Sequence, residues 1–170
     1  MKYGKKFILT DKFVINSFGI KLFQIKCTKS FKYAQKGDFG GYVEKEGNLD
    51  QENDAWVFGN ARVFGNARVS SNARVSGDAW VSDNARVSGD ADIENDNEHC
   101  GFDGFGSCNR HTHAYMTKEK KVEIICGCFR GSIEEFEKKV EETHSGTVYE
   151  KQYKSIINVI KIKFGLTDFT

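Results

Sequence analysis

The sequence predicts a mainly β protein whose central part is a parallel β-helix. Two observations predict it: a six-residue repeat runs through the middle of the chain, and each repeat carries a short segment centred on valine. The repeat is clearest in ARVFGNARVSSNARVSGDAWVSDNARVSGDADI, residues 61–93. Six steps of about 100° would put successive valines on opposite sides of an α-helix, so the repeat excludes a helix.

The repeats align into nine rungs, each with one aliphatic residue that is expected to point inward. This column consists of Val43, Leu49, Val57, Val63, Val69, Val75, Val81, Val87 and Ile93, with a two-residue insertion between Leu49 and Val57. Because the chain has no proline, Gly, Asn, Asp and Ser must form the corners between rungs. Three corners close a triangular coil, so the nine rungs predict about three coils and a stacking interval of 18 residues.

The stacking interval also predicts contacts on the outer surface. It places Arg62 beside Trp80, and Trp56 beside Arg74, so that each guanidinium is expected to stack on an indole ring. Phe58 and Phe64 are expected to point outward, where another subunit or the N-terminal segment covers them.

Segments on both sides of the repeat are expected to close its open ends. Residues 1–42 are predicted to form an N-terminal β cap with two strands around residues 17–19, residues 43–98 the repeat, and residues 99–170 a C-terminal α/β module. In this module KKVEIICGCF predicts a strand of a β-hairpin, and a first helix begins with a capping box formed by Ser132 and Glu135. A second helix is predicted over about residues 149–164.

Composition narrows the classes of partner. The 25 Lys and Arg residues balance 24 Asp and Glu, a formal net charge of +1, which gives no general basic field for nucleic acid. No apolar run approaches the roughly 18 residues of a membrane span, and the N-terminus lacks a signal-peptide core. Five cysteines, an odd number clustered late in the chain, indicate reduced thiols. We therefore expect a cytoplasmic protein that binds neither membranes nor nucleic acid in general.

The repeat lacks the catalytic groups of hexapeptide-repeat enzymes. Residues 43–98 contain no histidine and no cysteine, whereas acyltransferases of this class use a histidine base and the related carbonic anhydrases need three zinc-binding histidines. All four histidines lie after the repeat. Seven ligand-type residues in that part offer a zinc site as an alternative, although their spacing matches no familiar zinc module: His99, Cys100, Cys108, His111, His113, Cys126 and Cys128. We expect no catalytic residue, metal or cofactor.

The segment GFGSCNRHTHAYMTKEKKVEIICGCFRGS, residues 104–132, is the candidate ligand site. It combines a glycine turn, polar donors and aromatic rings, and free backbone N–H groups at the following helix start would form an anion cradle with Arg130. The candidate ligand-binding residues are Ser107, Asn109, Arg110, Thr112, Tyr115, Phe129, Arg130, Gly131 and Ser132. The alternative is that Ser132 and Glu135 simply cap a helix, with Phe129 in the core and Arg130 in solvent.

Two flanking motifs make the sequence resemble a family of phage and prophage hexapeptide-repeat proteins. They are KGDFGGYVEKEGNLDQENDAWVFGNARV, residues 36–63, and GCFRGSIEEFEKKVEETH, residues 127–144. The resemblance covers the chain from about residue 36 and implies a left-handed β-helix, an α/β C-terminal part and no established catalytic activity. Where the family usually has an arginine after a Gly-Ser pair, this chain has Cys108, and Arg110 lies two residues later.

These observations lead to one expected function and two alternatives. We expect a non-catalytic binding protein that sequesters a small anionic, nucleotide-derived signalling molecule, as a phage counter-defence protein would in the host cytoplasm. The first alternative is an acyl or nucleotidyl transferase with a base such as His99 or His144, and the second is an oligomeric protein-binding scaffold. By resemblance to other left-handed β-helices, the protein is expected to form a homotrimer or another homo-oligomer.

Overall fold

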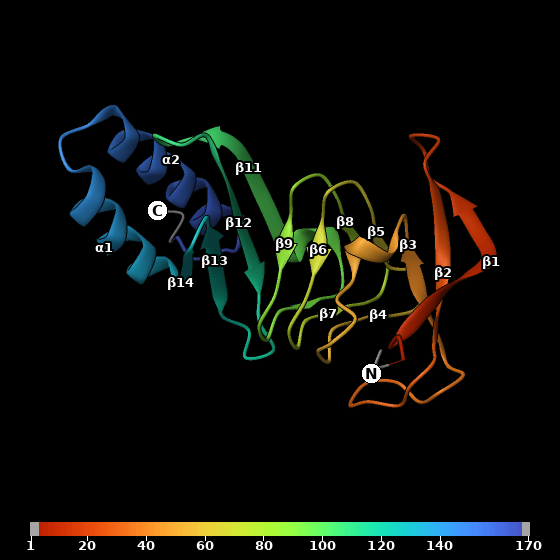
Figure 1. Ribbon diagram of the computed structural model, residues 1–170. Helices are drawn as coiled ribbons and strands as arrows, with labels where there is room; N and C mark the ends of the chain where they lie inside the picture. Colours follow the sequence, from red (N-terminus) through yellow and green to blue (C-terminus); the bar gives the residue numbers. More distant parts are fainter. Residues whose placement is uncertain (1–3, 168–170) are drawn as a thin grey trace. The chain divides into compact units, whose positions relative to one another are not determined.

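The computed structural model describes residues 4–167, which divide between Asp96 and Asn97 into two compact units. The N-terminal unit holds the repeat together with the segment before it, and the C-terminal unit is an α/β module. The fold is mainly β with two α-helices, as predicted (Figure 1).

The repeat forms very short parallel strands, each built on one inward valine or isoleucine. The strands are β4 (Trp56–Val57), β5 (Arg62–Val63), β6 (Arg68–Val69), β7 (Arg74–Val75), β8 (Trp80–Val81), β9 (Arg86–Val87) and β10 (Asp92–Ile93). They pair in parallel as β4-β7-β10, β5-β8 and β6-β9, always with the strand 18 residues away, which confirms the predicted interval. Every aliphatic residue of the column is at most 2% exposed.

Corners between these strands use left-handed backbone, as the Gly, Asn, Asp and Ser composition predicts. Ser71 and Asp83 adopt φ values of 59° and 57° at corners where other repeats have glycine. The alanine after each corner donates its N–H back across the turn, as from Ala61 to the carbonyl of Phe58 at 3.1 Å.

The predicted stacking of arginine on tryptophan occurs at one of the two positions. The guanidinium of Arg62 lies 4.8 Å from the ring centre of Trp80, in the predicted register. Trp56 pairs with Arg74 in register, but the guanidinium of Arg74 lies over the ring of Phe58 at 5.3 Å. The prediction of Trp56 as the stacking partner of Arg74 is therefore wrong.

The segment before the repeat forms three strands that extend one of its sheets. They are β1 (Phe7–Ile15), β2 (Lys21–Cys27) and β3 (Phe39–Val43), in the order β1-β2-β3-β5-β8, and a short 3-10 helix, η1 (Glu46–Asn48), follows. β1 and β2 form the predicted hairpin around residues 17–19. Gly40 allows β3 to approach the next rung closely, because a Cβ there would lie 2.6 Å from the carbonyl oxygen of Val57.

This segment covers aromatic residues that the repeat pattern predicts to be exposed. Phe64 is only 5% exposed, since it packs with Leu22 and Tyr42 and its ring lies 6.4 Å from that of Phe18. Phe58 is half-buried. The N-terminal segment therefore covers Phe64, which is one of the two coverings that were expected for these rings.

Lys6 fastens the N-terminal segment to the repeat. Its side chain is buried, and Nζ donates to the carbonyl oxygens of Asn53 and Ala55 at 2.5 and 2.9 Å. Burial lowers the pKa of Lys6 from 10.5 to about 8, although the nearby carboxylates of Asp50 and Asp54 act to raise it. Folding is therefore less favourable with a charged Lys6 side chain than with a neutral one.

We expect the stability of the N-terminal unit to rise as the pH increases from about 8 to about 10.5, the window between the folded and unfolded pKa values of Lys6. In this window the unfolded chain binds more protons than the folded chain, so deprotonation favours folding, by on the order of 1 to 3 kcal/mol. Urea unfolding at several pH values measures this slope. Lys6→Met should flatten it, whereas an equal slope in the variant would contradict the assignment to Lys6.

The C-terminal unit is a four-stranded antiparallel sheet packed against two helices. After a short 3-10 helix, η2 (Asp96–Glu98), come β11 (His99–Phe105), β12 (Arg110–Met116), β13 (Val122–Cys126) and β14 (Phe129–Ser132), paired in chain order. Then follow α1 (Ile133–His144) and α2 (Val148–Lys163). The sheet is therefore larger than the single hairpin that was predicted.

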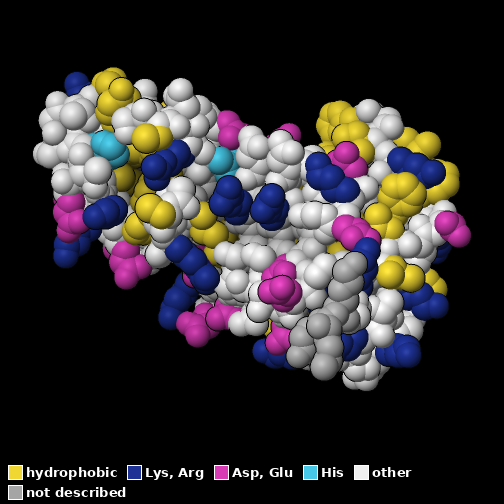
Figure 2. Space-filling view, in the orientation of Figure 1, with side chains coloured by type: hydrophobic (Ala, Val, Ile, Leu, Met, Phe, Trp, Pro, Cys, Tyr) yellow, Lys and Arg dark blue, Asp and Glu magenta, His cyan; other side chains and the backbone are white. Residues whose placement is uncertain are grey.

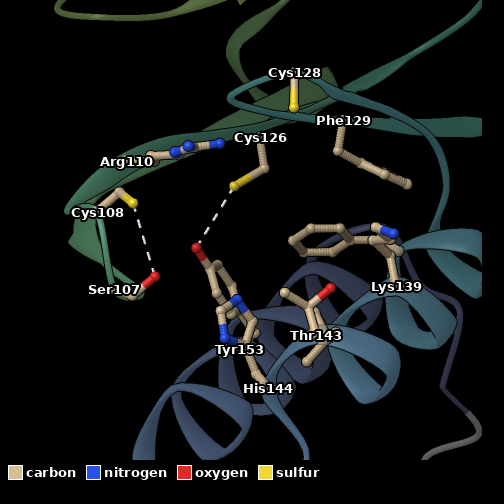
Figure 3. Close-up of a pocket in the computed structure, with 12 residues that line it drawn as sticks. Ser107, Cys108, Arg110, Cys126, Cys128, Phe129, Lys139, Thr143, His144 and Tyr153 are labelled. Carbon is tan, nitrogen blue, oxygen red and sulfur yellow. Dashed lines mark hydrogen bonds between the residues drawn. The ribbon is translucent and has the colours of Figure 1, made fainter.

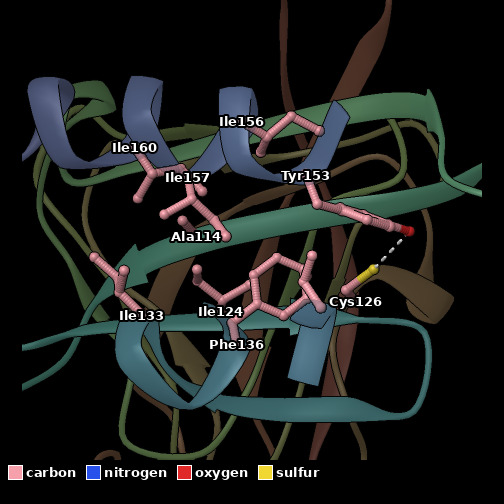
Figure 4. Packing of buried hydrophobic residues seen from close by; sticks show 10 residues of the cluster. Ala114, Ile124, Cys126, Ile133, Phe136, Tyr153, Ile156, Ile157 and Ile160 are labelled. Carbon is pink, nitrogen blue, oxygen red and sulfur yellow. Dashed lines mark hydrogen bonds between the residues drawn. The ribbon is translucent and has the colours of Figure 1, made fainter. Parts of the chain in front are cut away.

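One face of this sheet forms the core with both helices. Ala114, Ile124 and Cys126 project from the strands toward the helices (Figure 4). The helices contribute Ile133, Phe136, Tyr153, Ile156, Ile157 and Ile160. The first helix begins directly after its predicted cap residue Ser132, and the second lies within one residue of its predicted range, 149–164. Among residues 4–167, neither helix combines the length and the apolar character needed to cross a bilayer.

Candidate functional site

A cavity of about 220 Å³ lies in the C-terminal unit, between two turns of the sheet and the helices (Figure 3). One turn connects β11 to β12, the other connects β13 to β14, and the opposite wall comes from α1 and α2. Its lining residues are Ser107, Cys108, Arg110, Cys126, Cys128, Phe129, Phe136, Lys139, Val140, Thr143, His144 and Tyr153.

The charged groups of this lining are all of one sign. Arg110 and Lys139 are cationic side chains, His144 is a third basic residue, and none of the twelve lining residues is an aspartate or glutamate. Arg110 has no carboxylate partner among residues 4–167, while Lys139 lies 3.4 Å from Glu142 in an exposed pair. An exposed pair of this kind is weak, so the cavity keeps an excess of positive charge.

Aromatic rings form the inner wall of the cavity. Phe129 and Phe136 lie 5.0 Å apart between ring centres, and Phe136 meets Tyr153 edge to face at 5.6 Å. His144 stacks on Tyr153 at 5.5 Å with an angle of 29° between the ring planes. The cavity therefore joins an aromatic wall to a cationic rim, an arrangement that suits a small anion with an apolar or planar part.

The position of Tyr153 depends on a glycine in the opposite turn. Gly106 has a φ of 72°, and a Cβ at this residue would overlap the Tyr153 hydroxyl. The hydroxyl lies 3.7 Å from the sulfur of Cys126, and burial, followed by this contact, raises the pKa of Tyr153. Tyr153 is therefore a neutral wall of the cavity at physiological pH.

Of the nine residues predicted for the site, three line the cavity: Ser107, Arg110 and Phe129. Asn109 lies in the same turn as Ser107, with a left-handed φ of 47°. Thr112 is fully buried behind the lining and donates to the sulfur of Cys126 at 3.3 Å. Its predicted role as a direct ligand donor therefore does not fit its position.

Tyr115 and Arg130 lie on the opposite face of the sheet. Their positions alternate with those of Ala114 and Gly131, which are paired with Ile124 on the helix-covered face. Both contact Glu123: the Tyr115 hydroxyl donates to it at 2.6 Å, and Arg130 forms a two-pronged ion pair with it. Arg130 is therefore neutralised by a carboxylate, contrary to its predicted role as an anion ligand.

The predicted anion cradle at the start of α1 is occupied by the helix's own carboxylates. The N–H of Ser132 donates to Glu135 at 2.8 Å, and the Ser132 hydroxyl accepts from the N–H of Glu135 and donates to Glu134. Gly131 belongs to β14, where it is paired with Ile124. The capping box of Ser132 and Glu135, which belongs to the alternative interpretation of this segment, is present, whereas Arg130 is paired with Glu123 and Phe129 lines the cavity.

Sequence reasoning missed the contribution of α1. Five lining residues of this helix are spaced i, i+3, i+4, i+7 and i+8, which places them on one helical face: Phe136, Lys139, Val140, Thr143 and His144. The mixture of aromatic, cationic and polar residues on this stripe was a signal in the sequence, but nothing in the stripe indicates which turns of the sheet lie opposite it.

The other histidines contact one another rather than the cavity. Nδ1 of His99 lies 3.2 Å from Nε2 of His113, and His111 lies 2.8 Å from the carboxylate of Asp103. Among residues 4–167, no group of three or more histidine, cysteine or acidic side chains is arranged to hold a metal ion.

Comparison with known proteins identifies the repeat. Residues 55–71 and 67–83 each match the family described as the YdcK Beta solenoid repeat. Together with the parallel pairing at an interval of 18 residues, these matches define a β-solenoid repeat protein. No curated protein matches the chain.

Proposed function

We propose that this protein is a non-catalytic binding protein that sequesters a small anionic, phosphate-bearing molecule in the cavity of its C-terminal unit. The observation that carries the proposal is the lining, which has an arginine, a lysine and no carboxylate beside an aromatic wall. Arg110 would form charge-assisted hydrogen bonds to the phosphate oxygens, with Lys139 as a second cation and Ser107 and Thr143 as neutral donors.

The aromatic wall and the volume of the cavity narrow the ligand class. Phe129 and Tyr153 offer apolar and ring surface to a base or another planar group. At about 220 Å³ the cavity is smaller than the roughly 300–1,000 Å³ of typical small-molecule sites. We therefore propose a ligand of mononucleotide size or smaller within the cavity, with any larger nucleotide extending into solvent.

The proposed biological role is counter-defence: a phage-encoded protein that withdraws a nucleotide-derived signal in the host cytoplasm. It is supported by the two flanking motifs shared with phage and prophage hexapeptide-repeat proteins. The same resemblance supports a left-handed coil of about three turns for the repeat. The 18-residue pairing interval agrees with three rungs per turn.

Calorimetry with the full-length protein tests the binding function. The panel contains inorganic phosphate, simple nucleotides, ADP-ribose derivatives and cyclic dinucleotides, and each ligand is inspected by chromatography afterwards. We expect binding with recovery of the unchanged ligand. A chemically altered ligand would instead favour the transferase alternative, with His144 as the base that lines the cavity, and no binding to any member would favour the protein-binding scaffold.

The scaffold alternative has one specific observation in its favour, a set of exposed apolar side chains in the N-terminal unit (Figure 2). Ile15, Phe18 and Phe39 are 64%, 72% and 57% exposed. Large exposed apolar side chains of this kind mark association surfaces. Oligomerisation is thus proposed through these residues, and not through Phe64, which is covered.

We expect sedimentation at micromolar concentration to show a homotrimer or another homo-oligomer, and we expect Phe18→Ser and Phe39→Ser together to shift it toward the monomer. Val159→Ser is a control, because Val159 is a comparably exposed apolar residue of the other unit, at 47%. A wild-type protein that sediments only as a 19.2 kDa monomer would contradict the proposed assembly.

A further inference from the structure

The cavity contains three of the five cysteines, and two of these are exposed. Cys108 lies in the turn between β11 and β12, Cys128 lies in the turn between β13 and β14, and both side chains line the cavity with Cys126 (Figure 3). All five cysteines are free thiols. The exposed pair is therefore available to reagents that enter the cavity.

Arg110 lies between the two turns. Its guanidinium packs against Gly127, the residue next to Cys128, so closely that a Cβ on Gly127 would collide with it. The sulfurs of Cys108 and then Cys128 are the groups that raise the pKa of Arg110. A neutral thiol is a weak acceptor, so this guanidinium gains a strong interaction only when negative charge develops on sulfur or when an anion is bound.

The other three cysteines lack this combination of exposure and positive charge. Cys27 is buried in the N-terminal unit, and burial raises its pKa. Burial likewise raises the pKa of Cys100 to about 11. Cys126 is 7% exposed and lies behind its contacts with Thr112 and Tyr153. These thiols form an internal comparison for the exposed pair.

We propose that Cys108 and Cys128 form a reaction site for small anionic disulfides such as glutathione disulfide, and that the resulting adduct closes the cavity. The site takes anionic reagents because Arg110 and Lys139 lie in the same lining. The closing effect rests on the proposed function, whereas the reactivity of the two thiols does not.

The reaction is a thiol–disulfide exchange. The thiolate of Cys108 or Cys128 attacks one sulfur of the reagent, and a new S–S bond joins the protein to one half of it. The S–S bond of the reagent breaks, its electron pair stays on the other sulfur, and the released thiolate takes a proton from water. The cysteine is thereby oxidised and the released half is reduced. Arg110 attracts the carboxylates of the reagent and stabilises the negative charge spread over the three sulfurs in the transition state.

The adduct would occupy the space that the proposed ligand needs. A glutathionyl group on either turn carries two carboxylates, which would engage Arg110 and Lys139 in place of phosphate. The cavity of about 220 Å³ is too small to hold both groups. The oxidation state of two thiols would then control ligand binding.

Rates of modification with disulfides of opposite charge test the reaction site. The folded full-length protein is treated with 5,5′-dithiobis(2-nitrobenzoate), which is anionic, and with cystamine, which is cationic. We expect two thiols to react well before the other three. Arg110→Gln should slow the anionic reagent about fivefold relative to cystamine, the effect of one nearby charge. Cys108→Ser and Cys128→Ser should each remove one fast thiol, and Cys27→Ser should remove none.

Equal reactivity of all accessible thiols, or an Arg110→Gln effect that is the same for both reagents, would overturn the reaction site. Calorimetry with phosphate and nucleotides before and after treatment with glutathione disulfide then tests the closing effect. Binding that the adduct abolishes and a reductant restores supports it, and unchanged binding overturns it. A third outcome is that the two thiols react fast and with charge selectivity, but the protein binds no anion. This outcome would support the reaction site and overturn the proposed function, together with the closing effect that depends on it.

Discussion

Val75→Asp is expected to prevent folding of the N-terminal unit. Val75 is fully buried, and β7 is paired on both sides, so that Val75 lies between Val57 and Ile93 in a column of aliphatic side chains. The substitution removes roughly 1.5 to 3 kcal/mol of valine burial and adds an unpaired carboxylate to an apolar interior, at a cost of several kcal/mol more. Domains are stable by only about 5 to 15 kcal/mol, so the sum removes most or all of this margin.

Arg68→Asp is the matched control. It introduces the same carboxylate into β6, the preceding strand of the chain, but Arg68 is exposed and its register partner is Arg86. Thermal unfolding followed by circular dichroism, together with limited proteolysis, should show a nearly unchanged transition for Arg68→Asp. The loss of a cooperative transition is expected for Val75→Asp. Equal melting temperatures of the two variants would show that the valine column is not the interior of the repeat.

The repeat could be predicted in detail because the contacts of its strands from β4 to β10 recur at one fixed interval of 18 residues. Once the six-residue unit is aligned and three rungs are assigned to each turn, the partner of every rung follows, and the Arg62–Trp80 contact is a direct consequence. The corners could be predicted equally well, because only a few residue types readily adopt left-handed backbone.

The contacts between the N-terminal segment and the repeat could not be predicted from the six-residue period. Phe64 points outward, as the pattern requires, yet it is buried because Phe18 and Leu22 come from a segment about 40 residues earlier. Lys6 is a stronger case, because nothing in its sequence neighbourhood marks it as a buried ammonium bonded to Asn53 and Ala55. Such contacts depend on where a non-repeating segment folds back.

For the candidate site, strand alternation predicts on which face of the sheet each residue lies. Arg110 and Tyr115 are five residues apart in one strand and must face opposite sides, and the same holds for the neighbours Phe129 and Arg130. Alternation alone therefore separates Arg110 and Phe129 from the other two. The position of the α1 stripe opposite the two turns requires the packing of the helices on the sheet, which no local pattern supplies.

Arg110→Ala is expected to weaken the binding of the best anionic ligand about tenfold or more, without unfolding the C-terminal unit. Arg110 is an exposed cation of the cavity lining with no carboxylate partner among the described residues, so its removal deprives the ligand of a charged contact and leaves no buried charge behind. A hydrogen bond to a charged group contributes about 1.5 to 3 kcal/mol, and about 1.4 kcal/mol corresponds to one order of magnitude in affinity.

Arg130→Ala separates this cavity from the anion cradle predicted at the start of α1. Arg130 lies on the opposite face of the sheet in an ion pair with Glu123, so we expect this variant to bind with an affinity within about twofold of the wild type. Calorimetry with the same ligand compares both variants, and circular dichroism confirms their folding. A strong loss for Arg130→Ala with none for Arg110→Ala would place the anion at the helix start. If neither variant loses affinity, the bound anion lies outside the cavity and the proposed site is wrong.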